Sequence, residues 1–243
     1  INIPAGVFID VEGAICAGSA ACGATQGSAS SQVRFEWATP SDYSVTGRCY
    51  QQGNQLLTNS DAACGSGVII RSTINQASTG MSHVSFNNAY GYPIYVQTLQ
   101  AVQYGTLVFD GSSAVVDNLA FSNINTSNII ALDFAAPTIR DSTFTLGDDG
   151  RGYDAAAVRA YEAGAGILSA LTITGSTFTG NTQAQCGNQG GGRVLIYAES
   201  SYVSMDNLDI KDNAYGAFFK GSSGSLGNST INVLCNAIDT NSY

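Results

Sequence analysis

The most constraining feature of this sequence is a short unit that recurs along the chain. The unit is a polar or small residue, two variable residues and then a large apolar residue. Its clearest copies begin at residues 118, 141, 175, 207 and 228, with a fainter copy at residue 83. The apolar anchors lie 21 to 35 residues apart and are Phe86, Phe121, Phe144, Phe178, Ile210 and Ile231. A recurring supersecondary unit at such spacings predicts a stacked repeat architecture.

The segments between the anchors predict strands. The shortest interval, 21 residues, is too short for a helix pair but fits two or three strands of about five residues with tight corners. Strands that alternate apolar and polar residues point one face inward and the other outward. A single coil cannot bury its inner face, whereas stacked coils can.

One coil carries a more specific pattern. Phe178 and Asn181 fit an F-x-x-N box, and Gly191 and Gly192 fit a G-G-A-I/V box in which Arg193 stands where a small residue is usual. This coil resembles the repeats of polymorphic outer-membrane proteins. The wider pattern, from residue 68 to 243, resembles the pectin-lyase-like superfamily. The resemblance implies an all-β chain folded as a right-handed parallel β-helix, a solenoid whose known enzymes are mostly polysaccharide lyases and hydrolases.

Residues 1–66 differ from the rest of the chain because four of the six cysteines lie there among Gly-, Ser- and Gln-rich loops. We predict a disulfide-rich N-terminal cap over residues 1–66, followed by β-helix coils over residues 67–243, all within one structural domain. An even cysteine count without metal-ligand spacing favours three disulfides, with buried thiols as the alternative. The sequence leaves their pairing open among Cys16, Cys22, Cys49, Cys64, Cys186 and Cys235.

The same cysteines indicate an oxidising compartment. Because the sequence starts at Ile1 and shows no signal peptide, we interpret it as a processed, secreted chain that is extracellular or on a cell surface. Asn125 and Asn228 begin N-x-S/T sequons and are candidate glycosylation sites.

Composition excludes several partners. Only nine Lys and Arg residues and a net charge of −9 make nucleic acid a poor partner. No apolar run is long enough for membrane insertion by a helix. Charged residues make up 11% of the chain, against roughly 25% in typical domains. The outer surface must therefore consist largely of Ser, Thr, Asn, Gln and Gly.

Coil length varies mainly at one corner, and the longest corners span residues 146–156 and 179–192. Insertions gather on one side of a solenoid, often the binding face. Our candidates for glycan contacts there are Tyr153, Asn181, Gln183, Gln185 and Asn188. Asp148, Asp149 and Asp154 are candidate Ca²⁺ ligands, with a solvated turn as the alternative. We expect no other cofactor.

No catalytic residue is predicted. The charged candidates in the coils are Asp133, Arg140, Asp141, Arg159, Glu162, Glu199 and Lys220, and their positions do not stack into an evident convergent group. Asp133, for example, aligns with Ala160, Ile196 and Phe218. The lone His83 has no nucleophile motif beside it. A threonine run at residues 172–179 does not recur in neighbouring coils, which argues against an ice-binding face.

Two classes of function remain. The first is a non-catalytic extracellular structural or surface protein, a self-assembling filament or adhesive subunit with glycan contacts. Its expected partner is a second copy, bound head to tail between the apolar opening at residues 1–11 and the chain end near Tyr243. The alternative, supported by the superfamily resemblance, is a lyase or glycoside hydrolase that acts on an extracellular polysaccharide.

Overall fold

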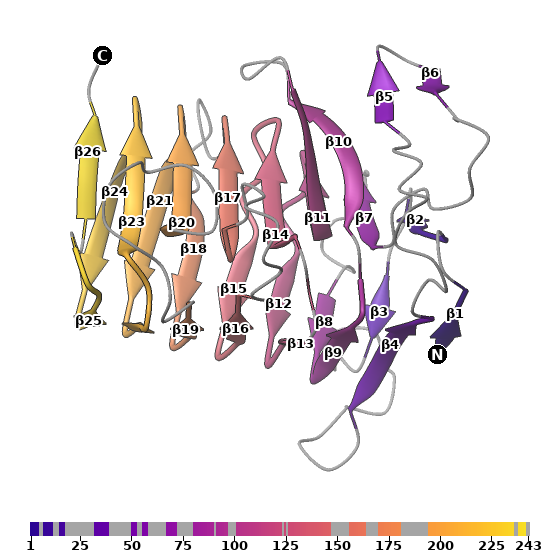
Figure 1. Cartoon of the computed structure of the whole chain (residues 1–243), viewed down its shortest axis with the longest axis horizontal. Coiled ribbons are helices and arrows are strands. Elements are labelled where there is room, and N and C mark those ends of the chain that lie inside the picture. The colour runs from indigo at the N-terminus through magenta and orange to yellow at the C-terminus, as the bar shows by residue number, and fades with distance from the viewer. Residues whose placement is uncertain are drawn as a thin grey trace.

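Three long parallel sheets build the molecule, as the computed structural model shows (Figure 1). The structure describes residues 1–4, 7–11, 15–17, 32–38, 50–52, 55–57, 67–71, 80–89, 91–96, 101–122, 124, 126–146, 156–163, 170–180, 194–235 and 238–241. Within these residues the fold is all-β and contains no helix. Strands stack along the long axis of the molecule, an arrangement consistent with a parallel β-helix.

The first sheet, sheet A, contains short strands paired in parallel. Its members in spatial order are β1 (Asn2–Ile3), β4 (Val33–Trp37), β9 (Val84–Asn87), β13 (Ala120–Ser122), β16 (Thr143–Thr145), β19 (Thr177–Thr179), β22 (Asp209–Lys211) and β25 (Thr230–Asn232).

Sheet B contains the longest strands. In spatial order it comprises β2 (Ile9–Val11), β7 (Val68–Arg71), β11 (Ala101–Asp110), β14 (Ser127–Leu132), β17 (Val158–Tyr161), β20 (Val194–Glu199), β23 (Tyr215–Lys220) and β26 (Ile238–Asn241). An additional strand, β10 (Tyr92–Val96), pairs antiparallel with β11.

Sheet C is the third of the parallel sheets. It comprises β3 (Cys16–Ala17), β8 (Gly80–Ser82), β12 (Val115–Asp117), β15 (Thr138–Arg140), β18 (Leu171–Thr174), β21 (Tyr202–Asp206) and β24 (Ser223–Gly227). A separate antiparallel pair consists of β5 (Tyr50–Gln52) and β6 (Gln55–Leu57). From β12 onward the chain visits sheets C, A and B in turn, so each coil adds one strand to each sheet.

The predicted anchors form one file inside sheet A. Strand register aligns all six of them, and the file continues backward to Phe35 on β4. Phe144 and Phe178 are fully buried, and their ring centroids lie 4.6 Å apart in a stacked arrangement. Similar stacking joins Phe35, Phe86, Phe121 and Phe144 at 5.1–5.5 Å. The repeated unit therefore corresponds to a column of side chains stacked in the interior, as predicted.

The first residue of the repeated sequence unit lies at the corner between sheets C and A. In all six copies it has a positive φ: His83, Asn118, Asp141, Gly175, Asn207 and Asn228. Asn, Asp and Gly tolerate this left-handed conformation best, which explains the polar or small residue three positions before each anchor.

A buried serine often follows this corner residue. The Ser142 hydroxyl donates to Arg140 O at 2.7 Å and accepts the Leu119 N–H at 3.1 Å. Ser176 repeats both contacts one coil later, with Thr174 O and the N–H of Ser142. Each serine thus joins two successive coils through the backbone, a reason for the Ser in the repeated unit.

Strands from the predicted cap region continue the three sheets. Within residues 1–66, β1 and β4 belong to sheet A, β2 to sheet B and β3 to sheet C, and all pair in parallel. Trp37 is buried there and donates from Nε1 to Val7 O at 2.7 Å. Cys235 is disulfide-bonded; the side chains of the other five cysteines lie outside the described residues, so the disulfide-rich cap stays a prediction.

Candidate functional site

Most of the residues predicted to bind lie outside the described part of the chain. This holds for the glycan candidates Tyr153, Asn181, Gln183, Gln185 and Asn188, for the calcium candidates Asp148, Asp149 and Asp154, and for the sequon residue Asn125. The corners that carry them do join sheet A to sheet B, between β16 and β17 and between β19 and β20. Among the described residues, no three His, Cys, Asp or Glu side chains could together hold a metal ion.

The second sequon residue, Asn228, is described. It occupies the last corner between sheets C and A with a φ of 40°. Its side chain is exposed and Nδ2 donates to Asp206 Oδ1 at 3.0 Å. A glycan on Asn228 would replace this contact, and glycosylation stays a prediction.

Strand register corrects the alignment of the charged residues. Asp133 does not align with Ala160, Ile196 and Phe218, because the residue before it, Leu132, already pairs with Tyr161. Tyr161 in turn pairs with Glu199, and Glu199 pairs with Lys220. The predicted alignment was therefore wrong, by two residues at Ala160, four at Ile196 and three at Phe218, and it separated Tyr161, Glu199 and Lys220, which share a row.

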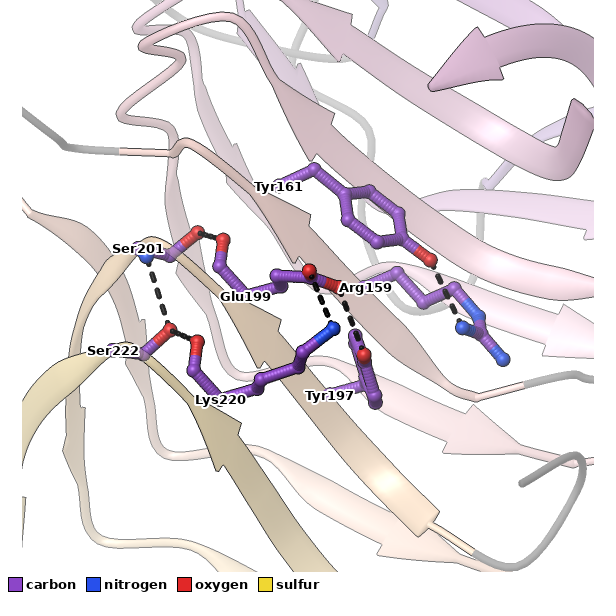
Figure 2. Close-up of polar contacts among 7 residues, drawn as sticks. All are labelled: Arg159, Tyr161, Tyr197, Glu199, Ser201, Lys220 and Ser222. Atoms are coloured by element: carbon purple, nitrogen blue, oxygen red, sulfur yellow. Dashed lines mark hydrogen bonds and ion pairs between the residues drawn. The ribbon is translucent and has the colours of Figure 1, made fainter. Parts of the chain in front are cut away.

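Five residues of β17, β20 and β23 form this group on the outer side of sheet B, and we call them the outer cluster. They are Arg159, Tyr161, Tyr197, Glu199 and Lys220 (Figure 2). Figure 2 shows the carboxylate of Glu199 between Tyr197 and Lys220, with Arg159 and Tyr161 beside them. Arg159 is 3% exposed and Glu199 is 7% exposed, so the cluster is unusually buried for a set of charged side chains.

Glu199 is the centre of the polar contacts. Tyr197 donates from its hydroxyl to Glu199 Oε2 at 2.9 Å, and Lys220 Nζ donates to Oε1 at 2.9 Å. Burial, followed by the hydrogen bond to Glu199, raises the pKa of Tyr197 well above its ordinary value. Tyr197 therefore keeps its proton at neutral pH and acts as a donor.

Arg159 brings a second cation into the cluster. Nε donates to Ser127 Oγ at 3.2 Å, and a terminal nitrogen donates to the Tyr161 hydroxyl at 2.9 Å. The guanidinium carbon lies 5.2 Å from the centre of the Tyr197 ring, within range of a cation–π interaction. The cluster thus combines a protonated phenol, a carboxylate and two cations.

Corner serines fix the backbone next to the outer cluster. The Ser201 hydroxyl donates to Glu199 O at 2.8 Å, and Ser222 donates to Lys220 O at 3.0 Å (Figure 2). Ser201 N also donates to Ser222 Oγ at 3.0 Å, which joins the two coils. Hydrogen bonds of Ser201 and Ser222 therefore join the ends of the strands that carry Glu199 and Lys220.

A second charged group lies toward the N-terminal end of sheet B. Arg71 bonds Asp10 at 3.1 Å and Asp110 at 2.8 Å. Burial, and then the like charge of Asp133, raises the pKa of the Asp110 carboxyl, whereas Arg71 lowers it. This group is separate from the outer cluster, with the apolar pair Ile130 and Leu132 of β14 between them in the sheet order.

The threonine run also recurs, contrary to our sequence analysis. Thr143 pairs with Thr177 and Thr145 with Thr179 on the outer side of sheet A. These two rows of threonines end at the next coil, where Asp209 and Lys211 occupy the equivalent positions. A regular ice-binding face is therefore still not favoured.

No family model, curated protein or solved structure significantly matches this chain. The described residues contain no helix that is long and apolar enough to cross a membrane.

Proposed function

We propose that this chain is a non-catalytic extracellular structural or surface protein that assembles end to end. The observation that carries the proposal is the exposure of core positions on the last coil. Leu226 follows the buried Met205 in the same inward row, and Ile231 follows the buried Ile210. Leu226 is nevertheless 37% exposed, and Leu234 of the same coil is 67% exposed. A covering surface would return Leu226 and Ile231 to the interior.

The opposite end has matching features. The same three sheets begin there with β1, β2 and β3, and Ile1 and Val7 of that coil are 66% and 43% exposed. Four of the seven exposed large apolar residues among the described ones therefore lie on the two end coils. Because the outermost described strands at both ends belong to the same three sheets, the first coil of one copy could extend the last coil of another. Such a head-to-tail contact does not close on itself and yields a filament.

Several finer features belong to the same proposal. Crossover connections between parallel strands are nearly always right-handed, which favours the right-handed winding of the pectin-lyase-like superfamily. Disulfides, export, glycan contacts at the long corners and Ca²⁺ at the aspartate-rich corner all suit a surface protein. None of them is needed for end-to-end stacking.

The test compares two apolar residues with similar exposure but different locations. Leu226 lies on the end coil and is 37% exposed, whereas Val115 lies on the side of the solenoid and is 39% exposed. We expect wild type and Val115→Lys to form fibres in negative-stain electron microscopy, and Leu226→Lys to remain monomeric in sedimentation velocity. Eight strands in sheet A correspond to an axial repeat of roughly 38 Å. Single short rods from the wild-type chain at high concentration would overturn the proposal.

The outer cluster favours a second candidate, a polysaccharide lyase. In β-elimination a base removes the proton next to a uronate carboxylate, and an acid protonates the departing glycosidic oxygen as the C–O bond breaks. Tyr197 presents a hydroxyl donor in the outer cluster and would be the acid. Lys220 would supply the base as a neutral amine, once it has separated from Glu199 and lost its proton to solvent. The site offers one carboxylate, whereas a glycoside hydrolase needs two.

A lyase is tested by ultraviolet absorbance of unsaturated uronate products from pectate, alginate and glycosaminoglycan. Activity should fall at least 100-fold in Tyr197→Phe and in Lys220→Ala if these residues supply acid and base. Lys211→Ala is the matched control, since Lys211 is also a half-exposed lysine paired with a carboxylate at 2.9 Å. If none of these polymers yields a product, with or without Ca²⁺, the lyase candidate is wrong and only the structural proposal remains.

A further inference from the structure

A file of buried residues lies next to the regular inward row of sheet B. The inward row pairs Val68, Leu107, Ile129, Val158, Ile196 and Ala217 across successive coils. The file consists of the residue just before each of these: Gly67, Thr106, Asn128, Ala157, Leu195 and Gly216. All six are buried, and Ala157 and Leu195 belong to the main hydrophobic core. The file therefore faces the inside of the solenoid.

Two neighbours in this file are polar and have no hydrogen-bond partner. Asn128 is 0% exposed, and neither its Oδ1 nor its Nδ2 is bonded to any described residue. Thr106, also 0% exposed, lies opposite Asn128 on the adjacent strand, and its Oγ1 is unbonded as well. Nearly all buried polar groups in proteins are satisfied, and an orphaned one is costly to bury. Three such atoms in adjacent residues point to a ligand.

The neighbours of these side chains in the file are small. Gly67 precedes Thr106 and Ala157 follows Asn128, so the polar pair is bounded on both sides by the two smallest residues. From Ala157 the file continues with the apolar Leu195, which packs in the core. The polar character is thus confined to two coils.

The chemistry of the three atoms defines the ligand. Oδ1 accepts, Nδ2 donates and the threonine hydroxyl does either. The occupant must therefore be small, able both to donate and to accept, and neutral, since a buried charge would need an opposite charge. We propose that Thr106 and Asn128 bind an ordered internal water molecule that links the coils of β11 and β14. Buried waters typically make about three hydrogen bonds to such groups.

This water site is independent of end-to-end assembly. Its test is made on the folded chain carrying Leu226→Lys, which we expect to remain monomeric and to tumble freely. Oxygen-17 magnetic relaxation dispersion counts water molecules that reside in a protein for longer than its tumbling time. We expect the double variant Thr106→Val/Asn128→Leu, which conserves volume, to lose at least one such water. The control Thr143→Val, on the exposed side of sheet A, should lose none. An unchanged count in a double variant with wild-type circular dichroism would overturn the proposal.

A second measurement does not depend on the variant folding. A high-resolution crystal structure of the wild type should show density within hydrogen-bond distance of both Thr106 Oγ1 and an Asn128 side-chain atom. Absence of such density would refute the site. A melting temperature that rises with K⁺ or Na⁺ but not with choline would instead identify a monovalent cation, and the water assignment would be wrong.

Discussion

The inner side of sheet A and the outer side of sheet B are built in the same way but differ in how regularly their residues repeat. Each is a set of side chains contributed one coil at a time. The inner file repeats large apolar residues, because every coil must fill the same space with an aromatic or branched side chain. The outer cluster repeats nothing, because Tyr161, Glu199 and Lys220 occupy one row with three different chemistries. Packing enforces periodicity inside, whereas the outer side is free to vary and can carry function.

Removing a ring from the inner file should have the largest effect. Phe144 is fully buried, with ring centroids at 5.4 Å and 4.6 Å on its two sides. Phe144→Ala should lower the free energy of unfolding by about 3–5 kcal/mol through lost burial and a cavity, measured by urea denaturation. The neighbouring exposed Thr143→Ala should change it by less than about 0.5 kcal/mol. Equal losses in the two variants would contradict the packing role of the file.

Neutralising the centre of the outer cluster should have the next largest effect. Glu199→Gln weakens the charge-assisted bonds from Tyr197 and Lys220, and we expect a loss of about 1–2 kcal/mol because Lys220 is partly exposed. It should also lower the pKa of Tyr197, although burial keeps this pKa above its ordinary value. Titration of ¹³C-labelled tyrosines by NMR, with Tyr197→Phe to assign the signal, measures this change.

The same tyrosine predicts how stability depends on pH. Because the folded pKa of Tyr197 is raised, the folded state holds the phenol proton more tightly than the unfolded state does. Its contribution is fully present below a pH of about 10, the ordinary tyrosine pKa, and is lost as the pH rises above that value. Tyr197→Phe should show a shallower loss of stability at high pH in urea denaturation, and an identical slope would contradict the assignment.

Substitutions at two corner glycines allow the cost of backbone strain to be measured separately from the cost of a steric collision. Gly175 and Gly221 have nearly the same φ, 60° and 54°. A Cβ on Gly175 would collide with Asp141 Oδ1, whereas nothing lies within 4 Å of a Cβ on Gly221. Gly221→Ala should therefore cost only the left-handed strain, about 1–2 kcal/mol, and Gly175→Ala should cost more. The difference between their urea midpoints measures the collision, and no difference would mean that the corner relaxes.

The smallest effect is expected at the acidic group of sheet B. Asp133→Asn removes the like charge that helps to raise the pKa of Asp110, so this pKa should fall while burial still holds it up. Asparagine tolerates the positive φ of Asp133. Stability at neutral pH should rise by a few tenths of a kcal/mol. NMR titration of the Asp110 carboxyl checks the shift, and an unchanged pKa would exclude coupling to Asp133.

The packing inside the solenoid was predictable from the sequence. The anchors, the strand character and the position of the long corners all follow from a period that packing enforces. The role of the corner residue was missed, although the signal was present: Asn118, Asp141 and Gly175 belong to the residue types that favour positive φ. The serine that follows was visible as a repeat but not as a coil-to-coil hydrogen bond, because its partner is a backbone N–H of the preceding coil.

The outer cluster was not predictable because its members lack a shared spacing. Arg159 and Glu199 are 40 residues apart, whereas Glu199 and Lys220 are 21 apart. Variable corner lengths therefore hide the register, and errors of two to four residues in the alignment were enough to separate the members of the group. Burial of Arg159 and Glu199 was likewise invisible, since charged residues are normally exposed.

The sequence by itself determined that this chain is all-β and repetitive, since apolar spacing and corner residues act locally and recur in every coil. Only the tertiary structure decided which side chains meet: the Tyr197–Glu199–Lys220 group, the unsatisfied Thr106–Asn128 pair and the exposed Leu226 at the end of the stack. The physical reason is register. Contacts between coils depend on how strands of unequal spacing align, and hydrogen bonding across the sheets fixes that alignment only when the chain folds.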